Sequence, residues 1–174
     1  MPIIATDILF FLTKVGGGAQ GNPNDSIGGE ISSTQIVDNT LHNLFDKVSG
    51  DQALAGMIDY RACYAKNNHG SITLETTKLW IQTNTSNSEI AIAKALEGAG
   101  NGSTTGVMER LANETTAPAG VTFSQPANKA AGILVGDLTP AQVHGIWERR
   151  SIGAATPGEN AATFQIKLEG DTQQ

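Results

Sequence analysis

The sequence contains few charged and few aromatic residues. Of its 174 residues, 16% are Asp, Glu, Lys or Arg and 5% are Phe, Trp or Tyr. So low a charged fraction is unlike a coiled coil, whose helices are rich in Glu and Lys, and unlike a highly charged disordered chain. The scarcity of aromatic residues also argues against a sugar-binding groove, which is built from several such rings.

Cysteine and long apolar runs are also scarce. Cys63 is the only cysteine, which excludes an intrachain disulfide and a cysteine-based zinc site. No apolar run approaches the ~20 residues that a membrane-spanning helix needs. The apolar segment 8–12 is short for the core of a signal peptide, and it follows Asp7 rather than a basic residue. We therefore expect a protein that is made in a cytosol and has no membrane partner.

Basic charge is too sparse for a nucleic-acid-binding surface. The chain carries a formal net charge of -6, and Arg149 and Arg150 are its only adjacent basic residues. An acidic chain repels the phosphate backbone, and contacts with phosphates supply most of the non-specific affinity for nucleic acids. We therefore expect no nucleic-acid partner.

Short apolar segments alternate with turn residues along most of the chain. The segments 7–12, 28–37, 89–96, 143–152 and 162–168 are typical of β-strands, and Gly, Asn, Pro and Ser punctuate the sequence between them. Residues 38–48 are the best helical candidate, because Asp38 could cap a helix and apolar residues recur at spacings of three and four, although a bent strand fits almost as well. No regular alternation of strands and helices is present, which disfavours an α/β sheet.

These patterns predict an all-β protein. We expect a β-sandwich, either immunoglobulin-like or jelly-roll-like, with at most one or two short helices; a β-barrel is the other architecture that the pattern allows. The predicted organisation is an N-terminal strand and glycine-rich arm over residues 1–27, followed by a single sandwich domain over residues 28–174. The glycine-rich stretch 16–29 has almost nothing to bury, so it predicts an exposed connection or a mobile arm.

No motif indicates catalysis or a bound cofactor. The glycines of residues 16–21 match the G-x-G-x-x-G pattern of dinucleotide-binding proteins, but the turn residues 22–25 follow where that motif requires a helix. Cys63 lies in a predicted strand, where an inert buried thiol is common. The three histidines lack metal-ligand spacing and are expected at the surface or at strand edges. The sequence thus predicts no enzyme, no metal, no cofactor and no catalytic residue.

Two short patches are candidate contacts with a partner. Trp147, Arg149 and Arg150 belong to the densest group of aromatic and charged residues, and Trp and Arg are enriched at interface hot spots, although a core Trp with solvated neighbours is the favoured alternative. Phe10 and Phe11 are adjacent, so in a strand their rings point to opposite faces. One ring then belongs to the core, and the other needs a second layer or a partner.

Several stretches resemble virion structural proteins of tailed bacteriophages. The similarity runs from about residue 4 to residue 171, and is carried by residues 5–8 (ATDI), 28–34 (GGEISST), 38–46 (DNTLHNLFD), 59–61 (DYR), 78–81 (KLWI), 117–123 (APAGVTF) and 147–150 (WERR). Among such proteins, the chain is most like a capsid decoration, or cement, protein in size, in its β-rich pattern and in its lack of catalytic motifs.

The resemblance implies a role in assembly. It implies that the protein resides in the virion, assembled in the host cytoplasm, and binds the major capsid protein and neighbouring copies of itself as a homo-oligomer. The N-terminal strand would then pair with the sheet edge of a neighbouring subunit. Two alternatives stay open: a tail-tube, adaptor or fibre-associated virion protein, and a β-sandwich module that binds a host surface or carbohydrate through an exposed Trp80 or Trp147.

Overall fold

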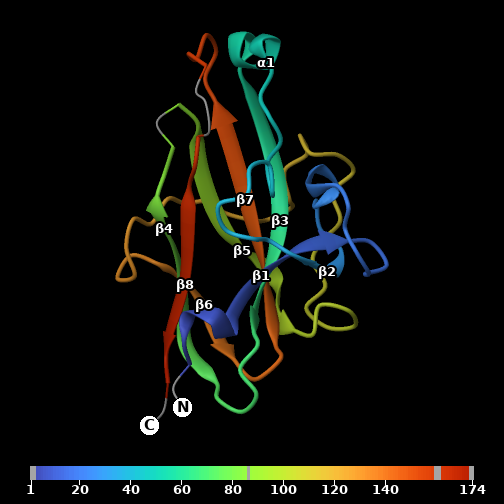
Figure 1. Cartoon of the computed structure of the whole chain (residues 1–174), viewed down its shortest axis with the longest axis vertical. Coiled ribbons are helices and arrows are strands. Elements are labelled where there is room, and N and C mark those ends of the chain that lie inside the picture. The colour runs from blue at the N-terminus through green and yellow to red at the C-terminus, as the bar shows by residue number, and fades with distance from the viewer. Residues whose placement is uncertain (1–2, 86, 159–161, 173–174) are drawn as a thin grey trace.

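The computed structural model describes residues 3–85, 87–158 and 162–172, and it shows two antiparallel sheets packed face to face (Figure 1). The larger sheet has the strand order β2-β1-β3-β7-β5, and the smaller sheet has the order β6-β4-β8. The predicted all-β sandwich is therefore confirmed. The strands are β1 (Ile8–Lys14), β2 (Glu30–Gln35), β3 (Met57–Asn67), β4 (Leu74–Thr83), β5 (Glu89–Gly100), β6 (Ile133–Leu138), β7 (Val143–Ile152) and β8 (Gln165–Asp171).

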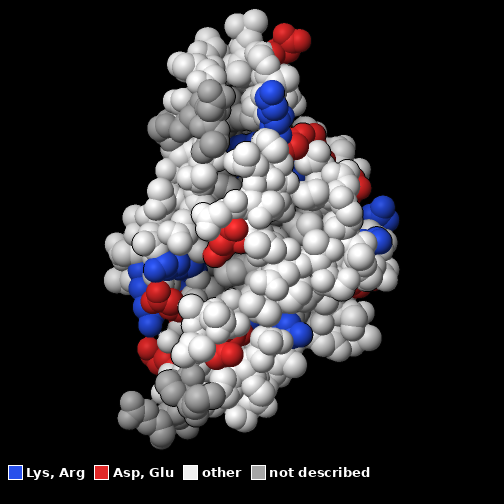
Figure 2. Space-filling model, viewed as in Figure 1, with Lys and Arg blue, Asp and Glu red and all other residues white. Residues whose placement is uncertain are grey.

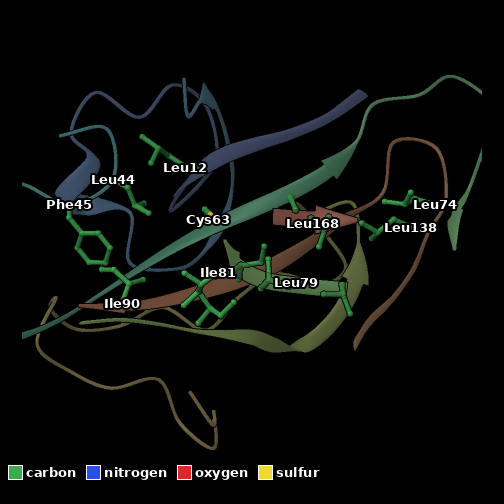
Figure 3. Packing of buried hydrophobic residues seen from close by; sticks show 14 residues of the cluster. Leu12, Leu44, Phe45, Cys63, Leu74, Leu79, Ile81, Ile90, Leu138 and Leu168 are labelled. Atoms are coloured by element: carbon green, nitrogen blue, oxygen red, sulfur yellow. The ribbon is translucent and has the colours of Figure 1, made fainter. Parts of the chain in front are cut away.

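The main hydrophobic core lies between the two sheets. Alternate residues of each strand point to the same face, so Leu12 of β1 and Cys63 of β3 face the smaller sheet together. Leu79 of β4 and Leu168 of β8 meet them from the opposite side (Figure 3). Burial of these side chains is the main contribution that holds the two sheets together.

A second core covers the outer face of the larger sheet, although no third sheet is present among the described residues. Trp147 of β7 and Tyr64 of β3 point to this face, where they pack with Met108 and Leu111 from the connection between β5 and β6. The Tyr64 hydroxyl donates a hydrogen bond to the Gly29 carbonyl oxygen at 2.7 Å. The central strands β3 and β7 are consequently buried on both faces, which explains why apolar residues occur at both parities in their sequences.

The predicted helix over residues 38–48 is wrong. Asn39 and His42 have φ values of 60° and 58°, which a right-handed helix does not accept, and the apolar Leu44 and Phe45 instead bury themselves in the core between the sheets. The α-helix lies just beyond, as α1 (Gly50–Ala55), and begins at a capping box in which the Ser49 side chain accepts a hydrogen bond from the Gln52 backbone.

Two 3₁₀ turns, η1 (Ala5–Asp7) and η2 (Pro23–Asp25), complete the helical elements of the described chain. None of the helices in these residues has the length and apolarity needed to cross a bilayer.

The N-terminal strand is not part of an extended arm. β1 lies inside the larger sheet, where Phe11 is paired with Tyr64 of β3 on one side and with Gln35 of β2 on the other. Both edges of β1 therefore have partners within the chain, and the expectation that this strand pairs with a neighbouring subunit is corrected. The physical reason is that Leu12 of β1 is buried in the core between the sheets, and Ile8 and Phe10 of the same strand pack against that core.

The glycine-rich stretch 16–29 is also held against the sandwich. Ser26 is fully buried, and its hydroxyl donates to the Ala62 carbonyl oxygen at 2.6 Å and accepts from the Thr13 amide at 2.7 Å. Gly28 has a φ of +100°, and a Cβ at this position would lie 1.8 Å from the Glu109 carbonyl oxygen. The glycine therefore permits a close backbone approach. Of the two alternatives, the stretch is a connection rather than an arm: several of its residues are exposed, and its last residues pack against the sandwich.

Candidate functional site

The densest group of ionisable side chains is buried at the α1 end of the space between the sheets. Asp59 of β3 and Arg150 of β7 are opposite each other in the strand register. Arg150 donates from Nε to Asp59 Oδ1 at 3.0 Å and from Nη2 to Oδ2 at 2.6 Å, so the pair is bidentate. Asp59 is fully buried, and burial raises the pKa of its carboxyl although Arg150 opposes the rise.

Arg61, two residues further along β3, joins several loops to this pair. Its Nη2 donates to Glu114 Oε2 at 2.6 Å and to Asn24 Oδ1 at 3.1 Å, and its Nε donates to the Leu44 carbonyl oxygen at 3.2 Å. The Phe45 ring lies under both guanidinium groups, with its centroid 5.6 Å from the Arg61 carbon and 4.7 Å from that of Arg150. The arginines therefore fasten loops from distant parts of the sequence onto β3 and β7.

Glu148 and Cys63 form a second buried pair next to this network. The Cys63 thiol donates to Glu148 Oε1 at 2.9 Å, whereas Glu148 Oε2 has no hydrogen-bond partner among the described residues. Arg61 is opposite Glu148 in the register, but no salt bridge joins them, because the guanidinium is directed to Glu114. Glu148 is thus a fully buried carboxyl without a cation.

This environment sets the protonation state of both side chains. Desolvation raises the pKa of Glu148 to about 8, and it raises the pKa of the Cys63 thiol well above its ordinary value. At neutral pH the carboxyl keeps its proton and the thiol is not a thiolate. The pair therefore lacks the ionised sulfur that a nucleophilic cysteine needs, and Cys63 occupies the buried position in mid-strand that the sequence predicted.

Two surface hollows lie away from these groups. One hollow of about 390 Å³ lies beside the start of β5, and Glu89 is its only ionisable lining residue in the described chain. The other hollow, of about 350 Å³, lies between β2 and the connection that follows it, and His42 is its only ionisable lining residue in the described chain. No group of three or more His, Cys, Asp or Glu side chains in the described ranges is arranged to hold a metal ion. Neither hollow thus offers an acid–base pair or a ligand set.

The structure places most of the predicted contact residues inside the protein. Trp147 is 1% exposed and packs in the second core, and Arg150 is 6% exposed and holds Asp59. Phe10 packs against the core between the sheets. These three side chains are therefore structural in this chain, and the interpretation of Trp147 and Arg150 as surface contacts is corrected. The favoured alternative, a core Trp, is confirmed for Trp147, but the solvated neighbours that it expected do not include the buried Arg150.

Phe11 and Arg149 remain partly accessible. Phe11 is half-buried, with the Lys66 ammonium 5.9 Å from its ring centroid, and Arg149 is half-buried with its guanidinium carbon 5.4 Å from the centroid of Phe123. They lie on the same face of the larger sheet, but β3 separates β1 from β7, and the register pairs Phe11 with Tyr64 and Tyr64 with Gly145. Four residues along β7, or roughly 13 Å, then separate Gly145 from Arg149, so the structure does not bring the two candidates together.

Sequence reasoning missed the buried charges. Asp59, Arg61 and Cys63 share one parity on β3, and Glu148 and Arg150 share one parity on β7. Charges of both signs at alternate positions of two otherwise apolar strands are a signal that could have suggested cross-strand ion pairs. His144 was expected at a strand edge, yet it is 3% exposed on the inner strand β7.

Neither tryptophan offers a platform for stacking a sugar ring, because Trp80 and Trp147 are 7% and 1% exposed. Comparison of the chain with protein-family models, with curated proteins and with solved structures gives no match.

Proposed function

We propose that this protein is a structural component of a tailed-bacteriophage virion, and that it acts as a capsid decoration protein. In this role it binds the major capsid lattice and neighbouring copies of itself, and it stabilises the shell without catalysing a reaction. The proposal takes its identity from the resemblance of the short stretches described above, and it draws its physical support from the way the interior is built.

The observation that carries the proposal is that the buried ionisable groups bond to one another and to nearby loops. Asp59, Arg61 and Arg150 bind one another or nearby loops, and Glu148 is bonded to Cys63. None of these side chains lines the two surface hollows beside β5 and β2 described above. Ionisable groups in an active site converge on an opening that admits a substrate. Here they fasten strands and loops together, which is the arrangement expected of a rigid subunit.

The outer surface is suited to contacts with other proteins. Figure 2 shows a face on which charged side chains are scattered among a large uncharged area. Charged residues are depleted from the centres of protein interfaces, because each charge must lose its water when the surfaces meet. A surface with few charges therefore has a small desolvation cost on assembly.

The copy number of the protein in purified virions tests the proposal. Quantitative mass spectrometry should give a number comparable to that of the major capsid protein, which serves as the internal reference. A number that matches a single tail ring, adaptor or fibre would refute the decoration role and favour the tail-associated alternative. Absence from purified virions would refute the proposal altogether.

A second test measures the effect on the shell. Purified protein is added to shells that lack it, and we expect saturable binding together with a higher temperature of shell disruption. The same shells mixed with the heat-unfolded protein are the control. Saturable binding that leaves the disruption temperature unchanged would contradict the stabilising role.

A further inference from the structure

The two edges of the larger sheet are covered by other parts of the chain. At β2, the Ile31 amide donates to the Gly102 carbonyl oxygen at 3.1 Å. At β5, Ile92 and Ser124 exchange backbone hydrogen bonds of 2.9 and 3.0 Å. At these positions the outward backbone groups of β2 and β5 already have partners within the chain and are not available to another strand.

The edges of the smaller sheet differ from each other. At β6, the Lys94 ammonium donates to the Leu134 carbonyl oxygen at 3.0 Å, so a charged group from β5 lies against this strand. The other edge is β8, which pairs with β4 alone (Figure 1). No backbone hydrogen bond joins β8 to any described residue outside β4. Every second N–H and C=O of β8 consequently points away from the sheet and is available to a further strand.

The charges of β8 indicate which strand would fit. Lys167 and Glu169 lie two residues apart on the outer face, with Nζ and Oε1 4.0 Å apart and side-chain exposures of 38% and 47%. Leu168 between them points into the core. In an antiparallel pair of two β8 strands centred on Leu168, Lys167 of each copy lies opposite Glu169 of the other. The register thus creates two cross-strand ion pairs.

Other registers are less favourable. Centring the pair on Lys167 would place this lysine opposite itself, and centring it on Glu169 would oppose two carboxylates. Like charges directly opposite each other destabilise a sheet. A shift that changes parity would place Leu168 of one copy opposite a charged residue of the other and mismatch the faces of the joined sheets.

We propose that two copies of this chain associate through antiparallel pairing of their β8 strands, centred on Leu168, so that two β6-β4-β8 sheets join into one continuous sheet. The pairing deepens the proposed structural role, on which its biological meaning rests, because it names the strand through which neighbouring copies meet. This pairing gives hydrogen-bond partners to the outward backbone groups of β8, and the opposite charges of Lys167 and Glu169 determine its register.

Charge reversal tests this arrangement in solution with the full chain. Sedimentation equilibrium should show that the wild type dimerises, and that Lys167→Glu and Glu169→Lys each weaken the dimer at least about tenfold, because two attractive pairs become repulsive. Mixing the two variants, or combining both substitutions in one chain, restores opposite charges and should restore dimerisation. Lys47→Glu is the control, since it makes the same charge change at an exposed site outside β8.

Crosslinking provides a second measurement that does not depend on charge. A mixture of Lys167→Cys and Glu169→Cys chains should form a disulfide-linked dimer under oxidation to a greater extent than either variant alone. Cys63 is fully buried and does not compete.

A wild type that stays monomeric at all concentrations would overturn the inference. The charges of β8 would then serve to prevent pairing at this edge. A dimer that resists both charge reversals would overturn it too. The copy number in virions is independent of these results, so the failure of this inference is distinguishable from failure of the proposed function.

Discussion

The buried carboxyl of Glu148 makes the stability of the protein dependent on pH. Its pKa is raised from an ordinary value of 4.5 to about 8, because the fully buried group has lost its water and has no cation beside it. Above pH 4.5 the unfolded chain releases this proton, whereas the folded chain holds it until about pH 8. The unfolded state therefore binds fewer protons across this range, and the contribution of Glu148 to stability falls as the pH rises.

The size of this effect follows from the shift. Each pKa unit corresponds to about 1.4 kcal/mol, so the rise from 4.5 to about 8 costs up to about 5 kcal/mol of folding free energy once the pH exceeds 8. Replacement of Glu148 by Gln removes the titration and keeps a side chain of similar shape. Any packing cost of the amide is independent of pH.

Denaturant unfolding between pH 4.5 and pH 8.5 measures this difference. The free energy of unfolding of Glu148→Gln minus that of the wild type should increase by up to about 1.4 kcal/mol per pH unit across this range. Asp59, whose pKa burial raises, and His144, whose pKa burial lowers, are present in both proteins, so their contributions cancel in the difference.

Glu89→Gln is the matched control, because Glu89 is exposed. Its difference from the wild type should show no comparable slope. If the Glu148→Gln difference is flat with pH, or decreases as the pH rises, the assignment of a protonated buried carboxyl is wrong.

Three further changes test the interior. Asp59→Asn removes the bidentate carboxylate of the buried Arg150 and leaves it only the carboxylate of Asp46, whose Oδ1 lies 3.2 Å from Nη2. The change should lower the free energy of unfolding by about 2–4 kcal/mol, as measured in urea; a loss below about 1 kcal/mol would show that the pair is not desolvated. Gly28→Ala should cost at least about 2 kcal/mol in the same assay, because the residue has a φ of +100° and its Cβ would clash with the Glu109 carbonyl; unchanged stability would contradict the close packing of this connection. Cys63 should be inert to a thiol reagent in the native protein and react when the protein is unfolded in urea; rapid labelling of the native protein would contradict its burial.

Part of the candidate site was readable from the sequence. The position of Cys63 in mid-strand indicated an inert thiol, and the alternation around it indicated burial. The partners of the charged residues were not readable, because Asp59 and Arg150 are 91 positions apart and meet only through the register of β3 and β7. Alternating charges on an apolar strand can indicate that ion pairs form, but they do not indicate which distant strand supplies the partner.

The sequence by itself determined the all-β architecture, because turn residues interrupt short apolar segments too often for long helices. It also determined that Phe10 and Phe11 point to opposite faces, since adjacent residues of a strand always do. Only the tertiary structure decided which strand edges and side chains are covered by other segments of the chain and which stay exposed. β1 became an inner strand because both of its edges found partners, and Trp147 became a core residue because the connection after β5 covers its face. Such burial depends on contacts between segments that are distant in the sequence. The local pattern of residues does not specify which distant segment will cover a given strand.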